Sequence, residues 1–344
     1  MKERVKWIDV AKLLVIFLIF TWHLGEDVMG RAYSYIGLFH VPVFFFLSGC
    51  TENYNKENNF NRYFIKEVKE LLLPFLFFGI LSLIFEALNR DLDGETVIYW
   101  CKILIKGAPR EWYMAYQLWF LSALFVTKLV FKLLEYTKNR AVMLLVSLLI
   151  FFVAHNYLNT TYQNLPWNLY WVALYMVFYA IGYVVYPSLA DFFKLDTRTK
   201  RHSFNFSVIV TFIYSFVVIY YDEPINARAT EAGLVGGAAF LARTIFTGYF
   251  IICIAKELEN VSVFAEVGKD TLWLCGSEFI IKRVVVLLLD FLGLQFLITT
   301  PVTGFIYAFL LIIILEKIFV PVEKEIYYSI AKIVNFDSHL TDYN

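Results

Sequence analysis

The chain alternates long apolar stretches with short polar connections along its whole length. Ten of these stretches are long enough to cross a bilayer, for which a helix needs about 20 mainly apolar residues. They lie near 8–25, 33–51, 71–88, 117–134, 141–158, 168–187, 204–221, 235–255, 270–290 and 296–316. This pattern predicts an all-α, polytopic membrane helix bundle of about ten transmembrane helices. We expect it to form a single domain over residues 1–344.

The composition supports a membrane protein. Hydrophobic residues make up 60% of the chain and charged residues 17%, whereas soluble domains are about half apolar and one quarter charged. The stretch 96–107 is too short and too charged to cross, so we expect an interfacial or re-entrant helix there. The four cysteines have no metal-type spacing. We therefore expect no metal site. We also expect no bound cofactor and no nucleic-acid partner.

The basic residues predict the orientation of the bundle. Lysines and arginines concentrate in alternate connections, for example in 56–69, 132–140 and 194–201, and are sparse in the connections between them. The positive-inside rule then places both termini in the cytoplasm, with an even number of crossings. The predicted location is the plasma membrane, as a multi-pass protein.

Three ionisable residues lie in the first predicted span. Lys12 and His23 are eleven positions apart, which places them within about 20° of each other around the helix and about 16 Å apart along it. Asp9 is one turn from Lys12 and could pair with it at i,i+3. Lys12 could instead extend toward the inner interface, with His23 in the outer headgroups. We favour a functional interpretation for the aligned pair.

Two further polar features follow in the first hundred residues. In "FHVPVFFFLSG", His40 precedes Pro42, which is expected to open the helix locally, and Ser48 with Gly49 should allow close packing of another helix. A second histidine here is as consistent with packing as with function. Arg62, Lys66 and Lys69 then form a basic stripe at i, i+4 and i+7. Such a stripe is either a cytoplasmic anchor or a site for a phosphate-rich ligand.

The late spans also carry charges. Arg243 lies in the middle of the eighth predicted span, and a guanidinium at that depth implies a partner, a water-filled cavity or an anionic ligand. In the ninth span, Glu278 and Lys282 are spaced for an i,i+4 salt bridge, which we take as the expected role for both.

Several of these segments together resemble one family. The basic residue, ten residues and histidine of the first helix resemble the acyltransferase-3 family of integral membrane acyltransferases, as do "FHVPVFFFLSG", the basic run into "LLLPF", and "LWFLSALFV". The resemblance covers essentially the whole chain and is closest to the branch of O-acetyltransferases that act on sugars. The family usually has arginine where this chain has Lys12. Relatives often carry a late-helix histidine in the region of "TLWLCGSEFI", near Glu278.

The resemblance implies a reaction and a set of roles. It implies transfer of an acetyl group from acetyl-CoA, as co-substrate, to a hydroxyl of a bacterial cell-surface glycan, a capsular or wall polysaccharide or its lipid-linked precursor. His23 would be the general base, and Lys12 would supply catalytic positive charge. Acetyl-CoA would be bound by Arg62, Lys66, Lys69 and Arg243.

Two other interpretations stay open from the sequence. A transporter or flippase for a lipid-linked glycan would also combine many helices, buried charges and proline-broken spans. It should show pseudo-symmetric halves around a midplane site, whereas an acyltransferase should show a passage from the basic inner face to His23. A sensor that has kept the scaffold and lost the activity is the third interpretation.

Overall fold

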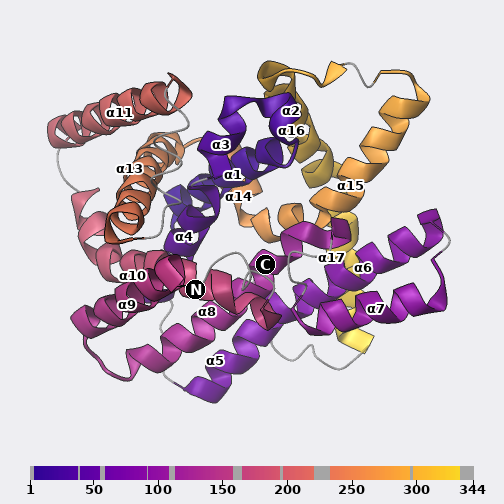
Figure 1. The fold of residues 1–344 in the computed structure, drawn as a ribbon, viewed down its shortest axis with the longest axis horizontal. Helices are drawn as coiled ribbons and strands as arrows, with labels where there is room; N and C mark the ends of the chain where they lie inside the picture. The colour runs from indigo at the N-terminus through magenta and orange to yellow at the C-terminus, as the bar shows by residue number, and fades with distance from the viewer. Residues whose placement is uncertain are drawn as a thin grey trace.

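The computed structural model describes residues 4–37, 39–54, 59–90, 92–107, 113–157, 165–193, 197–220, 233–294 and 297–333. Every regular element in these residues is a helix, which confirms the predicted all-α class. The chain runs through them in the order shown in Figure 1, from indigo to yellow.

The first half of the chain contains α1 (Lys6–Trp22), α2 (Glu26–Met29), α3 (Arg31–Gly37), α4 (His40–Tyr54), α5 (Phe60–Glu67), α6 (Leu73–Arg90), α7 (Gly94–Ile105), α8 (Trp119–Glu135) and α9 (Arg140–Tyr157). The second half contains α10 (Leu169–Phe192), α11 (Thr197–Tyr220), α13 (Leu234–Leu258), α14 (Ser262–Lys269), α15 (Thr271–Phe291), α16 (Pro301–Ile314) and α17 (Val320–Ile333). Short helical turns connect some of them: η1 (Val68–Leu72), η2 (Tyr113–Leu118), η4 (Pro166–Asn168) and η6 (Leu315–Phe319).

Each of the ten predicted stretches is mostly helical in its described residues, and 33–51 is divided between α3 and α4. Among the described residues, six helical segments are long and apolar enough to cross a membrane: Arg31–Glu52, Phe60–Arg90, Ala115–Glu135, Pro166–Phe192, Leu234–Leu258 and Pro301–Lys332. The remaining four stretches are α1, α9, α11 and α15. The short stretch 96–107 lies mostly in α7 (Gly94–Ile105), a helix of 12 residues. A polytopic helical bundle is therefore confirmed, and the figure of ten crossings stays a prediction.

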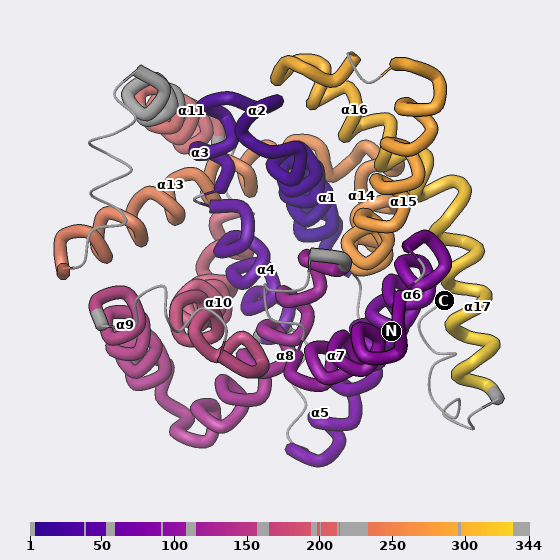
Figure 2. The backbone as a smooth tube through the Cα atoms, turned by 45° about the vertical axis from the view of Figure 1, so that its right-hand side comes forward, coloured from indigo at the N-terminus to yellow at the C-terminus, as the bar shows by residue number. Residues whose placement is uncertain are grey.

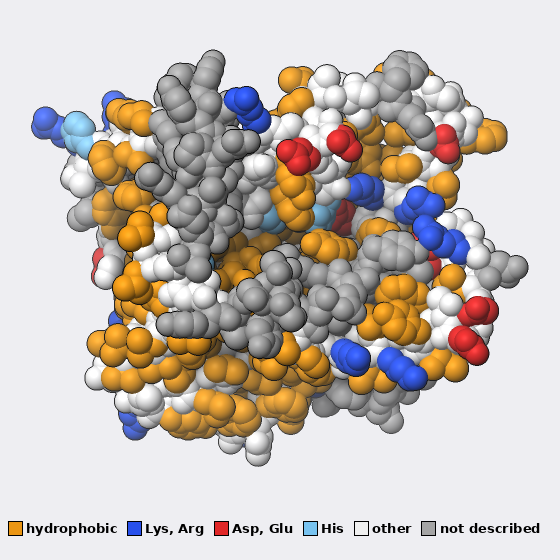
Figure 3. Space-filling model, in the orientation of Figure 1, with side chains coloured by type: hydrophobic (Ala, Val, Ile, Leu, Met, Phe, Trp, Pro, Cys, Tyr) orange, Lys and Arg blue, Asp and Glu red, His pale blue; other side chains and the backbone are white. Residues whose placement is uncertain are grey.

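The outer surface of the bundle is apolar. Exposed side chains follow rows at i and i+4, as on α6 and α9, where they are Ile80, Ile84, Leu88, Leu145, Leu149 and Val153. Hydrophobic side chains cover much of the face drawn in Figure 3. Soluble monomers rarely expose contiguous apolar patches of more than a few hundred square ångströms. These rows face lipid, and the protein is an integral membrane protein.

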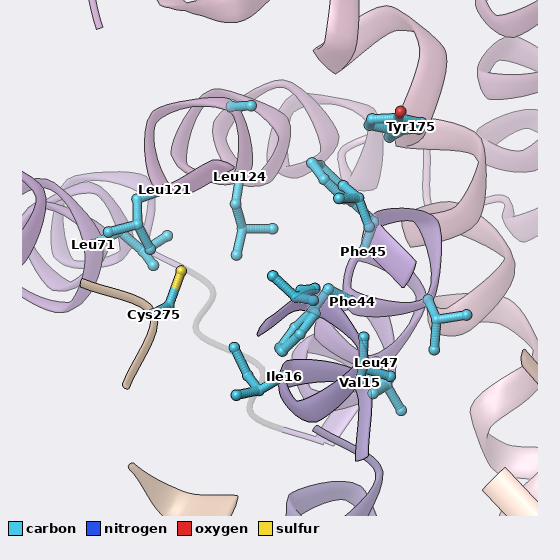
Figure 4. Close-up of a cluster of buried hydrophobic side chains, with 14 of the residues drawn as sticks. Val15, Ile16, Phe44, Phe45, Leu47, Leu71, Leu121, Leu124, Tyr175 and Cys275 are labelled. Atoms are coloured by element: carbon cyan, nitrogen blue, oxygen red, sulfur yellow. The ribbon is translucent and has the colours of Figure 1, made fainter. Parts of the chain in front are cut away.

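Helices α1 and α4 lie in the middle of the bundle, as Figure 2 shows. Helix α1 packs against α4, α13, α14, α15 and α16, and α4 packs against α10. In the core, Val15 and Ile16 of α1 lie near Phe44 and Leu47 of α4 (Figure 4), and these side chains are all buried. The helix that carries Lys12 and His23 is thus enclosed by other helices on most sides.

Small residues set how closely these helices approach. A Cβ on Gly49 of α4 would lie 2.0 Å from the main-chain oxygen of Tyr179 in α10, and one on Gly182 of α10 would lie 2.0 Å from that of Phe46. The close packing predicted at Gly49 is therefore confirmed. Pro42 does not open a continuous helix, however. Helix α3 ends at Gly37 and α4 begins at His40, so Pro42 lies in a first turn, where a missing N–H leaves no helical hydrogen bond unmade.

Candidate active site

His23 is held by a carboxylate from a distant part of the sequence. It follows directly on α1, where its main-chain N–H donates to Ile19. Its ring Nδ1 lies 2.7 Å from both carboxylate oxygens of Glu278 in α15. The Glu278 side chain is 3% exposed and that of His23 is 16% exposed. Because an ionised carboxylate can only accept, Nδ1 carries the hydrogen and donates it, which leaves Nε2 with the free lone pair.

Lys282 contacts the same histidine by a second route. It lies one turn beyond Glu278 on α15, and its ammonium donates to the main-chain carbonyl of His23. The prediction that Glu278 and Lys282 mainly pair with each other is therefore wrong. Glu278 contacts the ring of His23, and Lys282 contacts its main-chain carbonyl. The last carbonyls of a helix lack partners within the helix. A lysine from a neighbouring helix satisfies one of them and fixes α15 against the end of α1.

A cavity of about 270 Å³ opens beside this pair. Trp22, Tyr33 and Tyr116 form aromatic walls, and Gln117 and Lys282 add polar groups. The Trp22 and Tyr33 rings stack with centroids 4.9 Å apart and planes 5° apart. In Figure 3, pale-blue histidine and red carboxylate atoms lie at the bottom of a hollow near the centre of the face. The volume is close to the lower end of the range for small-molecule sites.

Two residues of the lining connect different elements of the bundle. Gln117 donates from Nε2 to the main-chain oxygen of Gly276, at 3.2 Å, which joins η2 to α15. Tyr116 meets the His23 ring edge-on, with centroids 6.3 Å apart. The sequence patterns analysed above did not single out either residue, although the segment "EWYMAYQLWF" that contains them is rich in aromatic residues.

The two candidates on α4 lie outside the cavity. His40 is 4% exposed, and its Nδ1 donates to the main-chain oxygen of Ile36 at 2.7 Å. Its ring centroid lies 5.0 Å from that of Trp22, so it packs behind the cavity wall. Ser48 is half-buried on α4, and its main-chain oxygen accepts from the Thr51 hydroxyl. Neither residue lines the His23 cavity as the structure describes it.

The other charged residues of the first helix are arranged differently from the prediction. Asp9 is buried and pairs with Arg4, with 2.9 Å between Arg4 Nε and Asp9 Oδ2, instead of pairing with Lys12. Arg4 precedes the helix and can present its planar guanidinium to the carboxylate, a geometry that Lys12 on the same helix cannot match. Lys12 is half-buried, and no described side chain forms a hydrogen bond or ion pair with it.

The predicted basic stripe is interrupted. Arg62 is exposed on α5, whereas Lys66 lies 3.8 Å from carboxylate oxygens of both Glu67 and Glu70. Lys69 falls in the π-helical turn η1, which starts at Val68. A π turn has more residues than an α turn, so the i+7 position no longer continues the face that starts at Arg62. The three cations do not form the single stripe that the spacing predicted.

A buried charge cluster that the sequence did not reveal lies next to this segment. Lys128 of α8 is 2.8 Å from Glu67 and 3.5 Å from Glu52 of α4. The Tyr63 hydroxyl donates to Glu52 at 3.3 Å. Glu52 and Glu67 are at most 3% exposed. The cluster ties α4, α5 and α8 together in the interior.

Arg243 is buried on α13, at 6% exposure. Helix α13 packs against α1 and α4, but Arg243 does not line the His23 cavity as described. The structure therefore brings together His23 and Glu278 among the predicted site residues. It places Lys12, Arg62, Lys66, Lys69 and Arg243 away from that cavity. Among the described residues, Lys282 is the cation that lines the cavity.

Comparison with known protein families identifies the class of protein. The family model described as an acyltransferase domain, that of the acyltransferase-3 family, matches residues 5–316. No curated protein and no solved structure matches the chain. The family match extends from before α1 to the turn η6, and so it includes both His23 and Glu278. The chain therefore belongs to the acyltransferase-3 family and is an integral membrane acyltransferase.

Proposed function

We propose that this protein transfers an acetyl group from acetyl-CoA to a hydroxyl of a bacterial cell-surface glycan, with His23 as the general base. The observation that carries the proposal is the His23–Glu278 pair at the edge of a cavity. A hydroxyl is a weak nucleophile at neutral pH, and a positioned histidine is the usual group that removes its proton. The family match favours this function over the transporter alternative.

In the proposed reaction, the acceptor oxygen attacks the thioester carbonyl carbon while Nε2 of His23 takes the hydroxyl proton. Glu278 stabilises the resulting imidazolium through Nδ1 and acts as a positioning residue. When the tetrahedral intermediate collapses, the C–S bond breaks and its electron pair goes to sulfur. His23 then returns the proton to give the CoA thiol and the acetyl ester.

The oxyanion of that intermediate needs positive charge nearby. The family resemblance implied that Lys12 supplies this charge. Lys282 lines the cavity and donates to His23, so we assign the role to Lys282. Lys12 is about 16 Å from His23 along α1. That distance suits contact with the CoA end of the donor better than contact with the reacting carbonyl.

The donor would enter from the opposite end of α1. Arg62, Lys66 and Lys69 are on or next to α5, on the side that the charge pattern assigns to the cytoplasm. We propose that they attract the phosphates of acetyl-CoA, with Lys12 further along its path and Arg243 on the neighbouring helix α13. Lys66 shares its charge with two carboxylates, so Arg62 should contribute more than Lys66.

The acceptor side of the proposal rests on the lining of the cavity. Trp22, Tyr33 and Tyr116 offer flat apolar faces, and Gln117 and Lys282 offer hydrogen-bond donors. Sugars present both apolar ring faces and hydroxyl groups, so this mixture suits a carbohydrate. A cavity of about 270 Å³ accepts a single sugar unit more readily than a folded protein segment.

The test measures glycan O-acetylation in the native host by proton NMR, with wild-type protein, a deletion, and the variant His23→Gln. Because general-base catalysis contributes about 10²–10⁴-fold, His23→Gln should remove nearly all of the acetyl signal. His202→Gln, which changes an exposed histidine on α11, is the matched control and should leave the signal unchanged. Full acetylation with His23→Gln would refute the mechanism. Unchanged acetylation in the deletion strain would refute the function.

A further inference from the structure

A second cavity, of about 220 Å³, adjoins the first. It is lined by Glu86 and Arg90 of α6 and by Phe279, Lys282, Arg283 and Val286 of α15. Phe279 and Lys282 also line the His23 cavity, so the two spaces share a wall. Blue lysine and arginine side chains gather beside the central hollow in Figure 3, where α15 faces α6 and α7.

The residues that line the second cavity carry a net positive formal charge. Arg90 Nε lies 2.8 Å from Glu86 Oε2, and the Glu86 side chain is 1% exposed, so this carboxylate offsets one cation. Lys282 donates to the main-chain carbonyl of His23, a neutral group that does not offset the formal charge of the lysine. With Arg283, the lining carries a net charge of about +2 from ordinary ionisation states. The cavity therefore favours a dianion over a neutral ligand.

Arg283 supplies a more specific signal. Its Nε is buried and has no hydrogen-bond acceptor among the described residues. A buried donor left without an acceptor costs about 1–3 kcal/mol, and more in a charged group. An oxyanion in the cavity would supply the missing acceptor, and a guanidinium binds the oxygens of phosphate with favourable geometry.

The position of the cavity relates the anion to the reaction. Lys282 and Arg283 follow Glu278 by four and five residues, which is about 6–8 Å along α15. An anion beside Arg283 would thus lie roughly one sugar unit from a hydroxyl at His23. A phosphate attached to the acceptor could occupy the second cavity while the acceptor hydroxyl occupies the first.

We propose that the second cavity binds a phosphate group of the acceptor glycan, so that the enzyme acetylates a sugar that carries a phosphate or is linked through one. This inference rests on the proposed function for the identity of the acceptor, but the anion site itself can be tested without it. A phosphate from a bilayer headgroup is the other source of the same chemistry.

The experiment measures binding of glucose 1-phosphate to the full-length protein in phosphatidylcholine nanodiscs by isothermal titration calorimetry. Methyl glucoside is the uncharged counterpart. Wild type should bind glucose 1-phosphate and not methyl glucoside, and sulfate should compete. Arg283→Gln should weaken binding by about tenfold or more, the loss expected for one charge-assisted hydrogen bond. Lys102→Gln, which removes an exposed cation of α7, should leave binding unchanged.

The inference is overturned if wild type does not discriminate between the two sugars, or if Arg283→Gln binds like wild type. If Arg283→Gln does not fold, the sulfate competition and the two sugars on wild type still decide the question. In nanodiscs with phosphatidylglycerol, displacement of glucose 1-phosphate by the lipid at low mole fraction would assign the site to a headgroup and overturn the acceptor phosphate. The titration contains no acetyl-CoA, so it reports the anion site and not acetyl transfer. Failure of the proposed function would therefore appear as unchanged acetylation in the deletion strain, while wild-type protein still binds glucose 1-phosphate.

Discussion

Replacing Glu278 by glutamine tests the geometry of the site directly. Glutamine keeps the size of the side chain, and its carbonyl oxygen can still accept from Nδ1 of His23, but the negative charge is lost. In the structure both carboxylate oxygens lie 2.7 Å from Nδ1 in a nearly buried position. A hydrogen bond to a charged group contributes about 1.5–3 kcal/mol, which corresponds to roughly a 10–150-fold decrease in kcat. Glu278→Ala also removes the acceptor, so its activity should fall further.

The assay is transfer of radiolabelled acetyl from acetyl-CoA to glycan by purified protein in nanodiscs, with kcat and KM measured separately. Because Glu278 acts through His23, Glu278→Gln should lower kcat and leave KM for acetyl-CoA nearly unchanged. Glu278→Asp should recover part of the loss. The matched control is Glu323→Gln, which changes a buried carboxylate that accepts from Ser277, the residue before Glu278.

Two results would contradict this reasoning. Folded Glu278→Gln protein with kcat within twofold of wild type would show that the carboxylate does not support the base. An equal decrease in kcat with Glu323→Gln would show that any buried carboxylate near this turn of α15 matters through packing, and not through the contact with His23.

Three further predictions concern the scaffold and the donor. Gly182→Ala places a Cβ 2.0 Å from a main-chain oxygen, so overpacking should cost about 1–3 kcal/mol and lower the Tm in detergent. Gly94→Ala, where a Cβ meets nothing within 4 Å, is the control and should have the Tm of wild type. A Gly182→Ala protein with the same Tm as Gly94→Ala would refute the close contact. Lys128→Met leaves Glu52 and Glu67 buried without their cation, and should lower the free energy of unfolding by about 3–5 kcal/mol. Thermal denaturation of the double variant with Glu67→Gln should show that part of this stability is recovered. If Lys12 contacts a phosphate of the donor, Lys12→Gln should raise KM for acetyl-CoA by about tenfold, with a smaller effect on kcat. An unchanged KM in steady-state kinetics would show that Lys12 does not contact the donor.

The structure also shows how one helix can serve both proposed sites. One turn of α15 presents Glu278, and the next turn presents the adjacent residues Lys282 and Arg283 to the space beside α1 and α6. The carboxylate contacts the histidine, the lysine lines both cavities, and the arginine faces only the second. A substitution that shifts α15 along its axis should therefore disturb the histidine pair and the anion site together.

The sequence by itself determined the helices and the class of protein. Runs of about 20 apolar residues must satisfy their backbone hydrogen bonds internally in a bilayer, and a helix does so within one segment. Most of the described residues in each of the ten predicted stretches are accordingly helical. The sequence also singled out His23 and Glu278, because ionisable side chains in apolar segments are costly and need a reason to be there.

Only the tertiary structure decided which of these groups meet. Helical periodicity reports neighbours three or four positions apart, and it therefore suggested Asp9 with Lys12 and Glu278 with Lys282. The observed partners are Arg4 for Asp9 and His23 for Glu278, 255 positions away in the sequence. Which helices become neighbours depends on packing over the whole bundle, including backbone contacts such as that between Gly49 and Tyr179. The active-site pair is a product of that packing, and no local pattern in the chain encodes it.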